Sequence, residues 1–268
     1  MFNKINKLYS CTHFARASSC ARLLGMLAAV LLITGCASKP TGPLDTQRLG
    51  SAIAIDDVGY VRSLVDAKII TPNQVASGIG YGAAPMVTVA ARNASLNVLR
   101  YLIAAKADLN ARTPDRDTAM MLAALFSEVD RDRDSVSYMR YDQAVRLLAE
   151  AGADIENIDI NAYTPLAYAA YAGRDSTVTY LLSKGAKPNA AAQGRVTYVN
   201  TPLMMAAMQG HRSVALHLLR AGADASVRVQ NGMTALEYAL KNKQTQLEKV
   251  LRCAESLKPG ETFRQRCE

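Results

Sequence analysis

Histidines, cysteines and clustered carboxylates are the side chains that could support catalysis or metal binding in this 268-residue chain. Beyond residue 35 the histidines are His211, which follows Gly210, and His217, which lies between two leucines in a pattern typical of a helix. The sequence contains no Cys-x-x-Cys pair, no His-Glu-x-x-His motif and no glycine-rich phosphate loop. We therefore expect no catalytic residue, no metal, no cofactor, no small-molecule substrate and a structural role for both histidines.

The run Asp130-Arg131-Asp132-Arg133-Asp134 places three carboxylates close together, as a calcium site would require. The interleaved arginines instead favour a solvated, self-paired loop or helix extension. We expect no calcium site in this run.

The first 35 residues have the layout of a secretory signal peptide. They carry four basic residues and no acidic one, and they end in an apolar run of 11 residues from Leu23 to Ile33. A helix that crosses a bilayer needs about 20 apolar residues. A cleaved leader is therefore favoured over a membrane span.

Four residues at the end of this leader, Ile33-Thr34-Gly35-Cys36, resemble the lipobox of bacterial lipoproteins. The resemblance implies cleavage after residue 35, lipidation of Cys36 and, with Ala37 next, transport to the outer membrane with the protein facing the periplasm. The alternative is an ordinary signal peptide with a chance cysteine. Residues 36–46 include Pro40, Gly42 and Pro43 and are expected to form a flexible tether.

Removal of the leader changes both the charge and the cysteine count. Four of the 31 basic residues leave and all 23 acidic residues stay, so the net charge falls from +8 to +4. This charge is too small to indicate nucleic-acid binding. With Cys36 lipidated, Cys253 and Cys267 remain, and we expect a disulfide between them in an oxidising compartment; two free thiols are the alternative.

Two segments of the chain repeat each other closely. Thr164-Pro165-Leu166 and Thr201-Pro202-Leu203 are each followed by an Ala-Ala pair, a glycine, a Leu-Leu pair and a Gly-Ala pair. Weaker copies begin near Pro85, Thr118 and Thr234, with 33 residues from Pro85 to Thr118 and 33 from Thr201 to Thr234. The pattern and its period resemble those of the ankyrin-repeat family.

The resemblance implies an all-α fold, an ankyrin-repeat solenoid of about six helix-turn-helix units with short β-hairpin loops over residues 47–257. A degenerate copy occupies about residues 47–80, and a tail follows at 258–268. Threonine before proline is expected to cap each inner helix, and Gly152, Gly185 and Gly222 suit left-handed helix ends. The longer spacing from Thr118 to Thr164 locates an insertion at Ser127–Tyr141, which we expect to project from the stack and to be dispensable for folding.

Inner-helix positions that face the concave side in this family form an apolar row, which we predict to be an exposed protein-binding stripe. The row consists of Leu122, Leu125, Phe126, Tyr168, Tyr171, Met205, Met208 and Tyr238, followed by Lys241. The alternative is that these side chains complete the packing between inner helices. Loop-tip residues are expected to add a polar rim: Arg112, Asp115, Arg116, Asn157, Asp159, Tyr163, Arg195, Tyr198, Arg228 and Gln230.

These features predict a membrane-anchored protein that binds another protein in the bacterial envelope, and not an enzyme. The partner's identity does not follow from the sequence. An inhibitor or immunity protein that covers the active site of a secreted or periplasmic enzyme is the alternative. A neighbouring gene for such an enzyme would favour the alternative.

Lipidation can be tested at Cys36. Only this cysteine combines small neighbours with the end of the apolar run, so Cys36→Ala should abolish labelling of the protein by a radioactive or clickable fatty acid. The unsubstituted chain should be labelled and should sediment with membranes. Continued labelling of the variant would show that the lipid is attached elsewhere.

Overall fold

The computed structural model describes residues 44–78, 81–125, 135–190, 196–197, 199–229, 232–258 and 260–267. The chain divides into two units, and Thr46–Glu268 forms the compact one described below. Within these described ranges, no helix is both long enough and apolar enough to cross a membrane. Cys36 lies outside them, so its lipidation stays a prediction.

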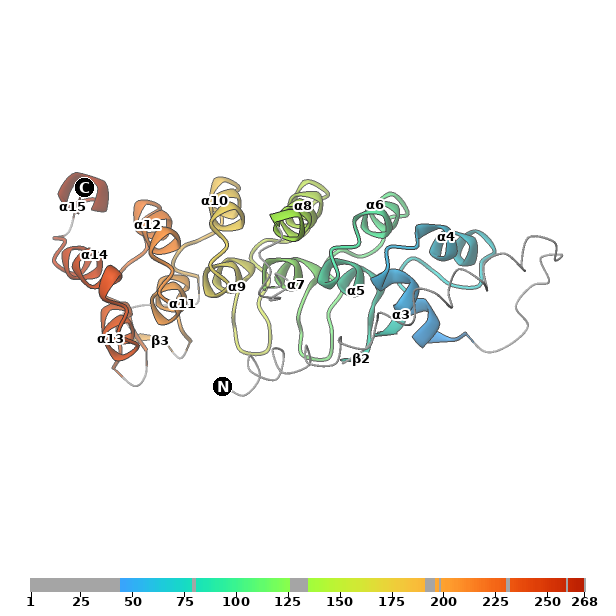
Figure 1. Ribbon diagram of the computed structural model, residues 1–268, viewed down its shortest axis with the longest axis horizontal. Helices are drawn as coiled ribbons and strands as arrows, with labels where there is room; N and C mark the ends of the chain where they lie inside the picture. The colour runs from blue at the N-terminus through green and yellow to red at the C-terminus, as the bar shows by residue number, and fades with distance from the viewer. Residues whose placement is uncertain are drawn as a thin grey trace. The chain divides into compact units, whose positions relative to one another are not determined.

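In the part of the chain that the structure describes, six pairs of helices follow one another (Figure 1). The first helices of the pairs form an inner row: α3 (Thr46–Ala54), α5 (Met86–Arg92), α7 (Ala119–Leu125), α9 (Pro165–Tyr171), α11 (Pro202–Gln209) and α13 (Ala235–Lys241). The second helices form an outer row: α4 (Val58–Asp66), α6 (Leu96–Ala104), α8 (Ser135–Glu150), α10 (Asp175–Ser183), α12 (Arg212–Arg220) and α14 (Thr245–Glu255).

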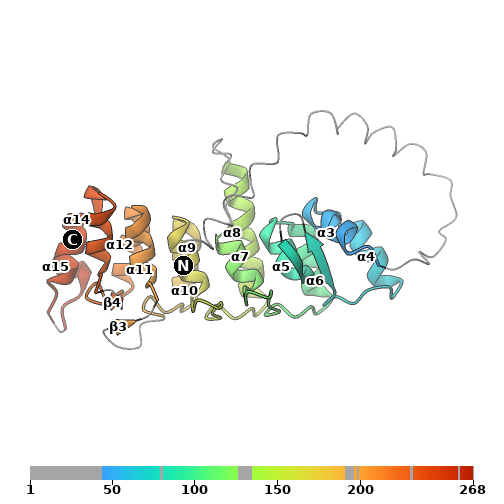
Figure 2. The ribbon, with the colours of Figure 1, turned by 90° about the horizontal axis from the view of Figure 1, so that it is seen from below.

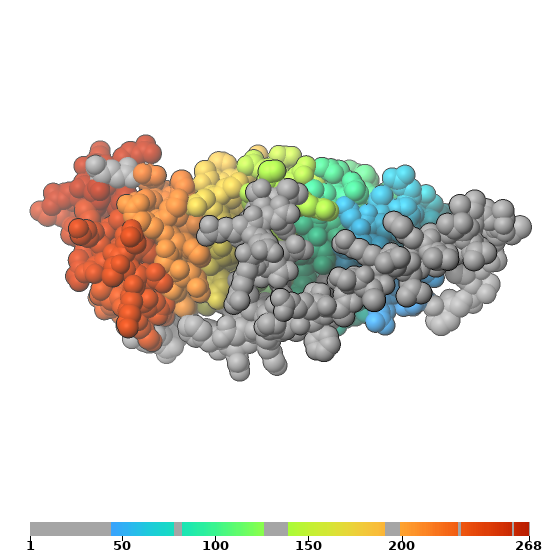
Figure 3. Space-filling view, viewed as in Figure 1, coloured from blue at the N-terminus to red at the C-terminus, as the bar shows by residue number. Residues whose placement is uncertain are grey.

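Each helix packs against its own partner and against its counterparts in the neighbouring pairs. The described pairs therefore follow one another in sequence order in the space-filling view (Figure 3). Leucine, alanine and methionine side chains between the layers form one continuous core. The predicted all-α repeat solenoid is confirmed.

The inner helices begin where the threonines predict. The hydroxyls of Thr164, Thr201 and Thr234 each accept a hydrogen bond of 3.3 Å from the backbone amide three residues later. Pro165 and Pro202 occupy the first helical turn, where a missing amide hydrogen costs nothing. Each cap satisfies an amide that the helix itself leaves unpaired.

The outer helices of the first five pairs are followed by left-handed residues, and the three predicted glycines are among them. Gly152, Gly185 and Gly222 have φ angles of 89°, 91° and 88°. Lys68 and Lys106 occupy the corresponding ends of α4 and α6 with φ of 57° and 60°. A non-glycine residue is strained in this conformation, by about 1 kcal/mol.

Short strands connect some of the repeats. β1 (Val75–Gly78) and β2 (Tyr81–Pro85) pair antiparallel between α4 and α5. β3 (Val196–Thr197) and β4 (Arg228–Val229) belong to successive connections and pair in parallel. The connections between repeats form one edge of the stack, the loop edge, and the turns within repeats form the opposite turn edge (Figure 2).

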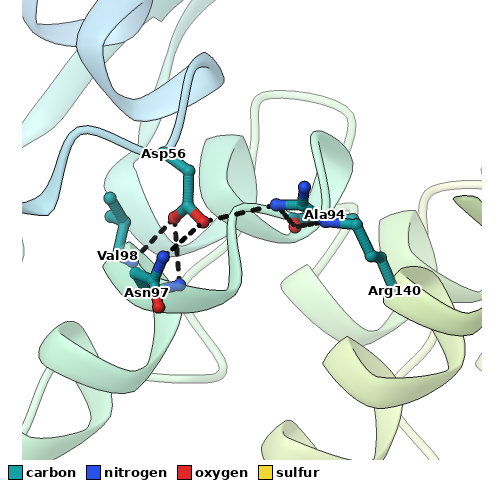
Figure 4. Close-up of polar contacts among 5 residues, drawn as sticks. All are labelled: Asp56, Ala94, Asn97, Val98 and Arg140. Atoms are coloured by element: carbon teal, nitrogen blue, oxygen red, sulfur yellow. Dashed lines mark hydrogen bonds and ion pairs between the residues drawn. The ribbon is translucent and has the colours of Figure 1, made fainter. Parts of the chain in front are cut away.

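The insertion was predicted to project from the stack on the edge opposite the loops; its described part does extend beyond the neighbouring helices there (Figure 2), but its last residues, Arg140 and Tyr141, pack against the preceding repeat. Residues 126–134 lie outside the described ranges, but the rest of the insertion forms the start of α8, which is visibly longer than its neighbours (Figure 2). Tyr141 is buried, and its hydroxyl donates to the carbonyl of Arg92 at 3.0 Å. Arg140 donates to the carbonyl of Ala94 at 3.0 Å (Figure 4). The end of the insertion therefore fastens α8 to the preceding repeat.

Asp56 joins this contact from the first repeat. Its carboxylate lies 3.3 Å from Nη2 of Arg140 and accepts hydrogen bonds of 3.0 Å from the backbone amides of Asn97 and Val98 (Figure 4). It thus caps α6, whose own N-cap residue Ser95 makes no side-chain capping bond. One ion pair links the first repeat to the third.

The tail packs against the outer row. Its helix α15 (Phe263–Cys267) contacts α12 and α14, and Phe263 is buried. Cys253 on α14 and Cys267 on α15 form a disulfide with a Cα–Cα distance of 5.9 Å. The disulfide holds the tail helix α15 against α14, the outer helix of the last pair.

Loss of this disulfide should weaken the fold. The two cysteines are 14 residues apart, and cross-linking a loop of this size restricts the unfolded chain by about 3 kcal/mol in the chain-entropy model. Cys267→Ser should lower the free energy of urea unfolding by roughly that amount, and wild-type protein in reducing buffer should match the variant. Two alkylated cysteines in the native, unreduced protein would contradict the bond.

Candidate protein-binding surface

The predicted concave stripe is buried, so its assignment as an exposed binding surface is wrong. Tyr168 is 3% exposed, Met205 is 1% exposed, and only Tyr171 is half-buried. Also buried are Leu122, Leu125, Met208 and Tyr238. Phe126 lies outside the described residues, and Lys241 is exposed. The alternative interpretation, packing between neighbouring inner helices, describes this row.

The contacts of Tyr168 explain why the predicted stripe is not accessible to a partner. Its hydroxyl donates to Oδ2 of Asp159 in the preceding loop at 2.9 Å, and its ring meets Tyr163 edge-on with centroids 6.1 Å apart. Burial raises the pKa of Tyr168 above that of a free tyrosine. The side chain therefore fixes the loop to the inner helix and is not available to a partner.

Asp159 is the centre of this loop. Its carboxylate accepts backbone hydrogen bonds from Asn161 at 2.9 Å and Tyr163 at 2.8 Å, in addition to the bond from Tyr168. A carboxylate that accepts several hydrogen bonds can be buried at little cost. Asp159 was predicted to lie on the exposed rim, but it is 2% exposed and holds the loop in one shape.

Successive loops are joined by a row of hydrogen bonds that the sequence analysis missed. A side-chain oxygen in each loop accepts the backbone amide of a residue in the next: Asn73 from Asp108 at 2.7 Å, Asn110 from Asp154 at 2.9 Å, Glu156 from Lys187 at 2.9 Å and Asn189 from Asp224 at 2.8 Å. One pattern in the sequence could have indicated these hydrogen bonds, because Asn110 and Asn189 each stand three residues after an alanine. These bonds set the position of each loop relative to its neighbour.

The loops of the third and fourth repeats share further bonds. Arg112 donates to the carbonyl of Ile158 at 2.8 Å and also to the side chain of Asn157. The amide of Ile160 donates to the carbonyl of Asp115 at 3.2 Å. Two loops far apart in sequence thus lie side by side as one rigid element.

Two isoleucines of this element face solvent. Ile158 is 39% exposed and Ile160 is 60% exposed, whereas the alternating residues Asn157 and Asp159 are buried. We call Arg112, Asp115, Arg116, Ile158 and Ile160 the loop surface; all five are exposed. Of the other rim residues, Arg228 is exposed, Asn157 and Tyr163 are buried, and Arg195, Tyr198 and Gln230 lie outside the described residues.

At the turn edge, side chains bind carbonyls at the ends of inner helices. Nε2 of His211 lies 3.1 Å from the carbonyl oxygen of Tyr171, and Asn242 donates to the carbonyl of Met208 at 2.8 Å. Burial lowers the pKa of His211, so its imidazole is neutral at pH 7. His211 therefore occupies a structural position between repeats.

The described residues hold no cluster of three or more histidine, cysteine or acidic side chains that could bind a metal ion. His217 has Asp175 as its acidic neighbour, with 3.8 Å between Nε2 and Oδ1.

Two family models match the chain. Residues 87–192 match a model of ankyrin repeats in three copies, and residues 166–219 match a second model of ankyrin repeats in many copies. No curated protein matches the chain. Within residues 87–219, the helix pairs and these matches identify ankyrin repeats, which in general mediate binding to other proteins.

Two truncations separate core from surface. Met205→Ala should lower the free energy of unfolding by about 2–5 kcal/mol, because it leaves a cavity between inner helices. Ile160→Ala removes a side chain that is mostly in solvent, so it should change the free energy of unfolding by less than about 0.5 kcal/mol. Urea unfolding measures both, and equal losses would contradict the division.

Proposed function

We propose that this ankyrin-repeat protein is a lipid-anchored scaffold of the bacterial envelope that binds another protein through its loop surface. Ile158 and Ile160 carry the proposal, because they are large apolar side chains left in solvent on an otherwise polar, hydrogen-bonded pair of loops. Apolar anchors surrounded by polar groups are the usual composition of an interface centre.

The rigidity of the loops supports this assignment. The bonds through Arg112, Asp115 and Asp159 fix the loop shape before any partner arrives. A preorganised surface avoids most of the entropy cost of ordering side chains and backbone on binding. The exposed charges of Arg116 and Asp115 beside the isoleucines would form the polar rim.

The leader and the cysteines support the location. A lipid on Cys36 would hold the repeats at the membrane by the ten residues up to Thr46, and tethering raises the effective concentration of a partner at the same membrane. The disulfide between Cys253 and Cys267 suits an oxidising compartment. A periplasm-facing outer-membrane lipoprotein combines these features.

Site-specific photo-crosslinking in intact cells tests the surface. A photoreactive amino acid in place of Ile160 or Arg116 should yield a discrete crosslinked protein, whereas the same group at Lys249, exposed on α14, should not. Ile158→Ala and Ile160→Ala should each weaken binding of that purified protein about thirtyfold, the effect of losing an anchor of about 2 kcal/mol.

The matched control is Ile55→Ala, because Ile55 is 77% exposed but lies on the turn edge of the first repeat. Its affinity should equal that of the unsubstituted chain. Crosslinks at Lys249 alone, or full affinity in both loop variants, would place the binding site elsewhere.

A further inference from the structure

Two arginine–tyrosine stacks lie between neighbouring outer helices. The guanidinium of Arg62 on α4 lies 5.4 Å from the ring centre of Tyr101 on α6. That of Arg146 on α8 lies 4.4 Å from the ring centre of Tyr180 on α10. The described part of the chain thus contains this arrangement in the first two repeats and again in the third and fourth.

The two tyrosine hydroxyls differ in their partners. Burial raises the pKa of the Tyr101 hydroxyl, and the carboxylate of Asp66, four residues after Arg62, is a neighbour that also raises its pKa. Glu150 stands four residues after Arg146, yet the Tyr180 hydroxyl is buried and has no hydrogen-bond partner among the described residues. A buried hydroxyl without a partner costs about 1–3 kcal/mol, so its presence requires an explanation.

Tyr180 lines an open groove of about 440 Å³ on the outer face. Arg146 forms one wall, and Asp175, Ser176, Thr179, Tyr180 and Ser183 of α10 form the other. Lys184 adds a second cation, with Nζ 5.4 Å from the ring centre of Tyr180. Asp175 is the acidic residue of the lining, and its Oδ1 lies 3.8 Å from Nε2 of His217 on α12.

The groups that line the groove separate into donors and acceptors. Arg146, Lys184 and the Tyr180 hydroxyl can donate to an anion. Thr179 and Ser183 already donate to the carbonyls of Asp175 at 2.8 Å and Tyr180 at 2.6 Å, so their oxygens are left to accept. A matching ligand has an anionic group at one end and hydroxyl groups at the other.

We propose that this groove binds the phosphate ester of a polyol, either as a soluble molecule or as the headgroup of a phospholipid. The phosphate binds Arg146, and movement of the Arg146 guanidinium off the Tyr180 ring exposes the buried Tyr180 hydroxyl, which thereby gains its missing acceptor. The ligand's hydroxyls donate to Thr179, Ser183 and Asp175. The site lies on the outer helices, so it does not depend on the proposed role of the loop surface.

Titration calorimetry with the full chain tests the site, with glycerol 3-phosphate and inorganic phosphate as probes. Glycerol 3-phosphate should bind more tightly than inorganic phosphate, because only the ester supplies hydroxyl donors. Tyr180→Phe and Arg146→Gln should each weaken its binding about tenfold or more, since each removes a hydrogen bond to a charged group.

The chain supplies its own matched control. Arg62→Gln removes the equivalent arginine of the other stack and should leave the affinity unchanged. Tyr180→Phe should not lower the melting temperature, because the hydroxyl that it removes has no partner in the fold. A lower melting temperature with unchanged affinity would show a purely structural hydroxyl and overturn the proposal.

Vesicle sedimentation distinguishes the two sources of the ligand. Vesicles of phosphatidylglycerol and of phosphatidylcholine are compared for the full chain and its variants, so that any contribution of the leader or anchor is the same throughout. A preference for phosphatidylglycerol that Tyr180→Phe and Arg146→Gln abolish supports a lipid headgroup. Binding of glycerol 3-phosphate without that preference supports a soluble ligand. If the protein shows neither this binding nor the preference for phosphatidylglycerol, the proposed site is wrong.

Discussion

Each ankyrin repeat is too small to bury its own apolar face, so every other feature of this protein depends on contact between neighbouring repeats. Apolar burial alone does not set the register of that contact. Polar side chains set it, because the last carbonyls of each inner helix have no partner within the helix. His211, Asn242 and Tyr141 each bind such a carbonyl in the preceding repeat. On the opposite edge, loop asparagines bind the amides of the next loop.

The third repeat shows how this register survives an insertion. Its outer helix begins with residues that other repeats lack, and these residues still reach back to the carbonyls of Arg92 and Ala94. The following repeat compensates in turn: buried Arg174 donates to the carbonyl of Ala123 at 3.1 Å and pairs with Asp142 on α8. A buried arginine with these partners avoids the penalty of an unpaired charge. The insertion is therefore built into the stack at its C-terminal end.

Local chemistry made much of the fold predictable. Threonine caps, the first-turn prolines and the left-handed glycines act within a few residues, so the sequence alone locates them. The concave row was not predictable, because the spacing of Tyr168 and Met205 is the same whether the side chain faces solvent or the next inner helix. The partner of Tyr168 is Asp159, in a loop whose shape depends on stacking. Ile158 and Ile160 could not be recognised as surface residues from the sequence, since only the bonds of Asn157 and Asp159 show which side of the loop faces inward.

Charge distinguishes the loop edge from the chain as a whole. The loops at residues 108–117 and 154–163 contain six acidic residues and two arginines, although the chain as a whole is basic. A field of this kind guides the approach of ligands more than it strengthens their final binding. It would favour basic partners at the loop edge, whereas the outer helices α8 and α10 carry two arginines and three acidic residues and offer an anion only the local contact with Arg146.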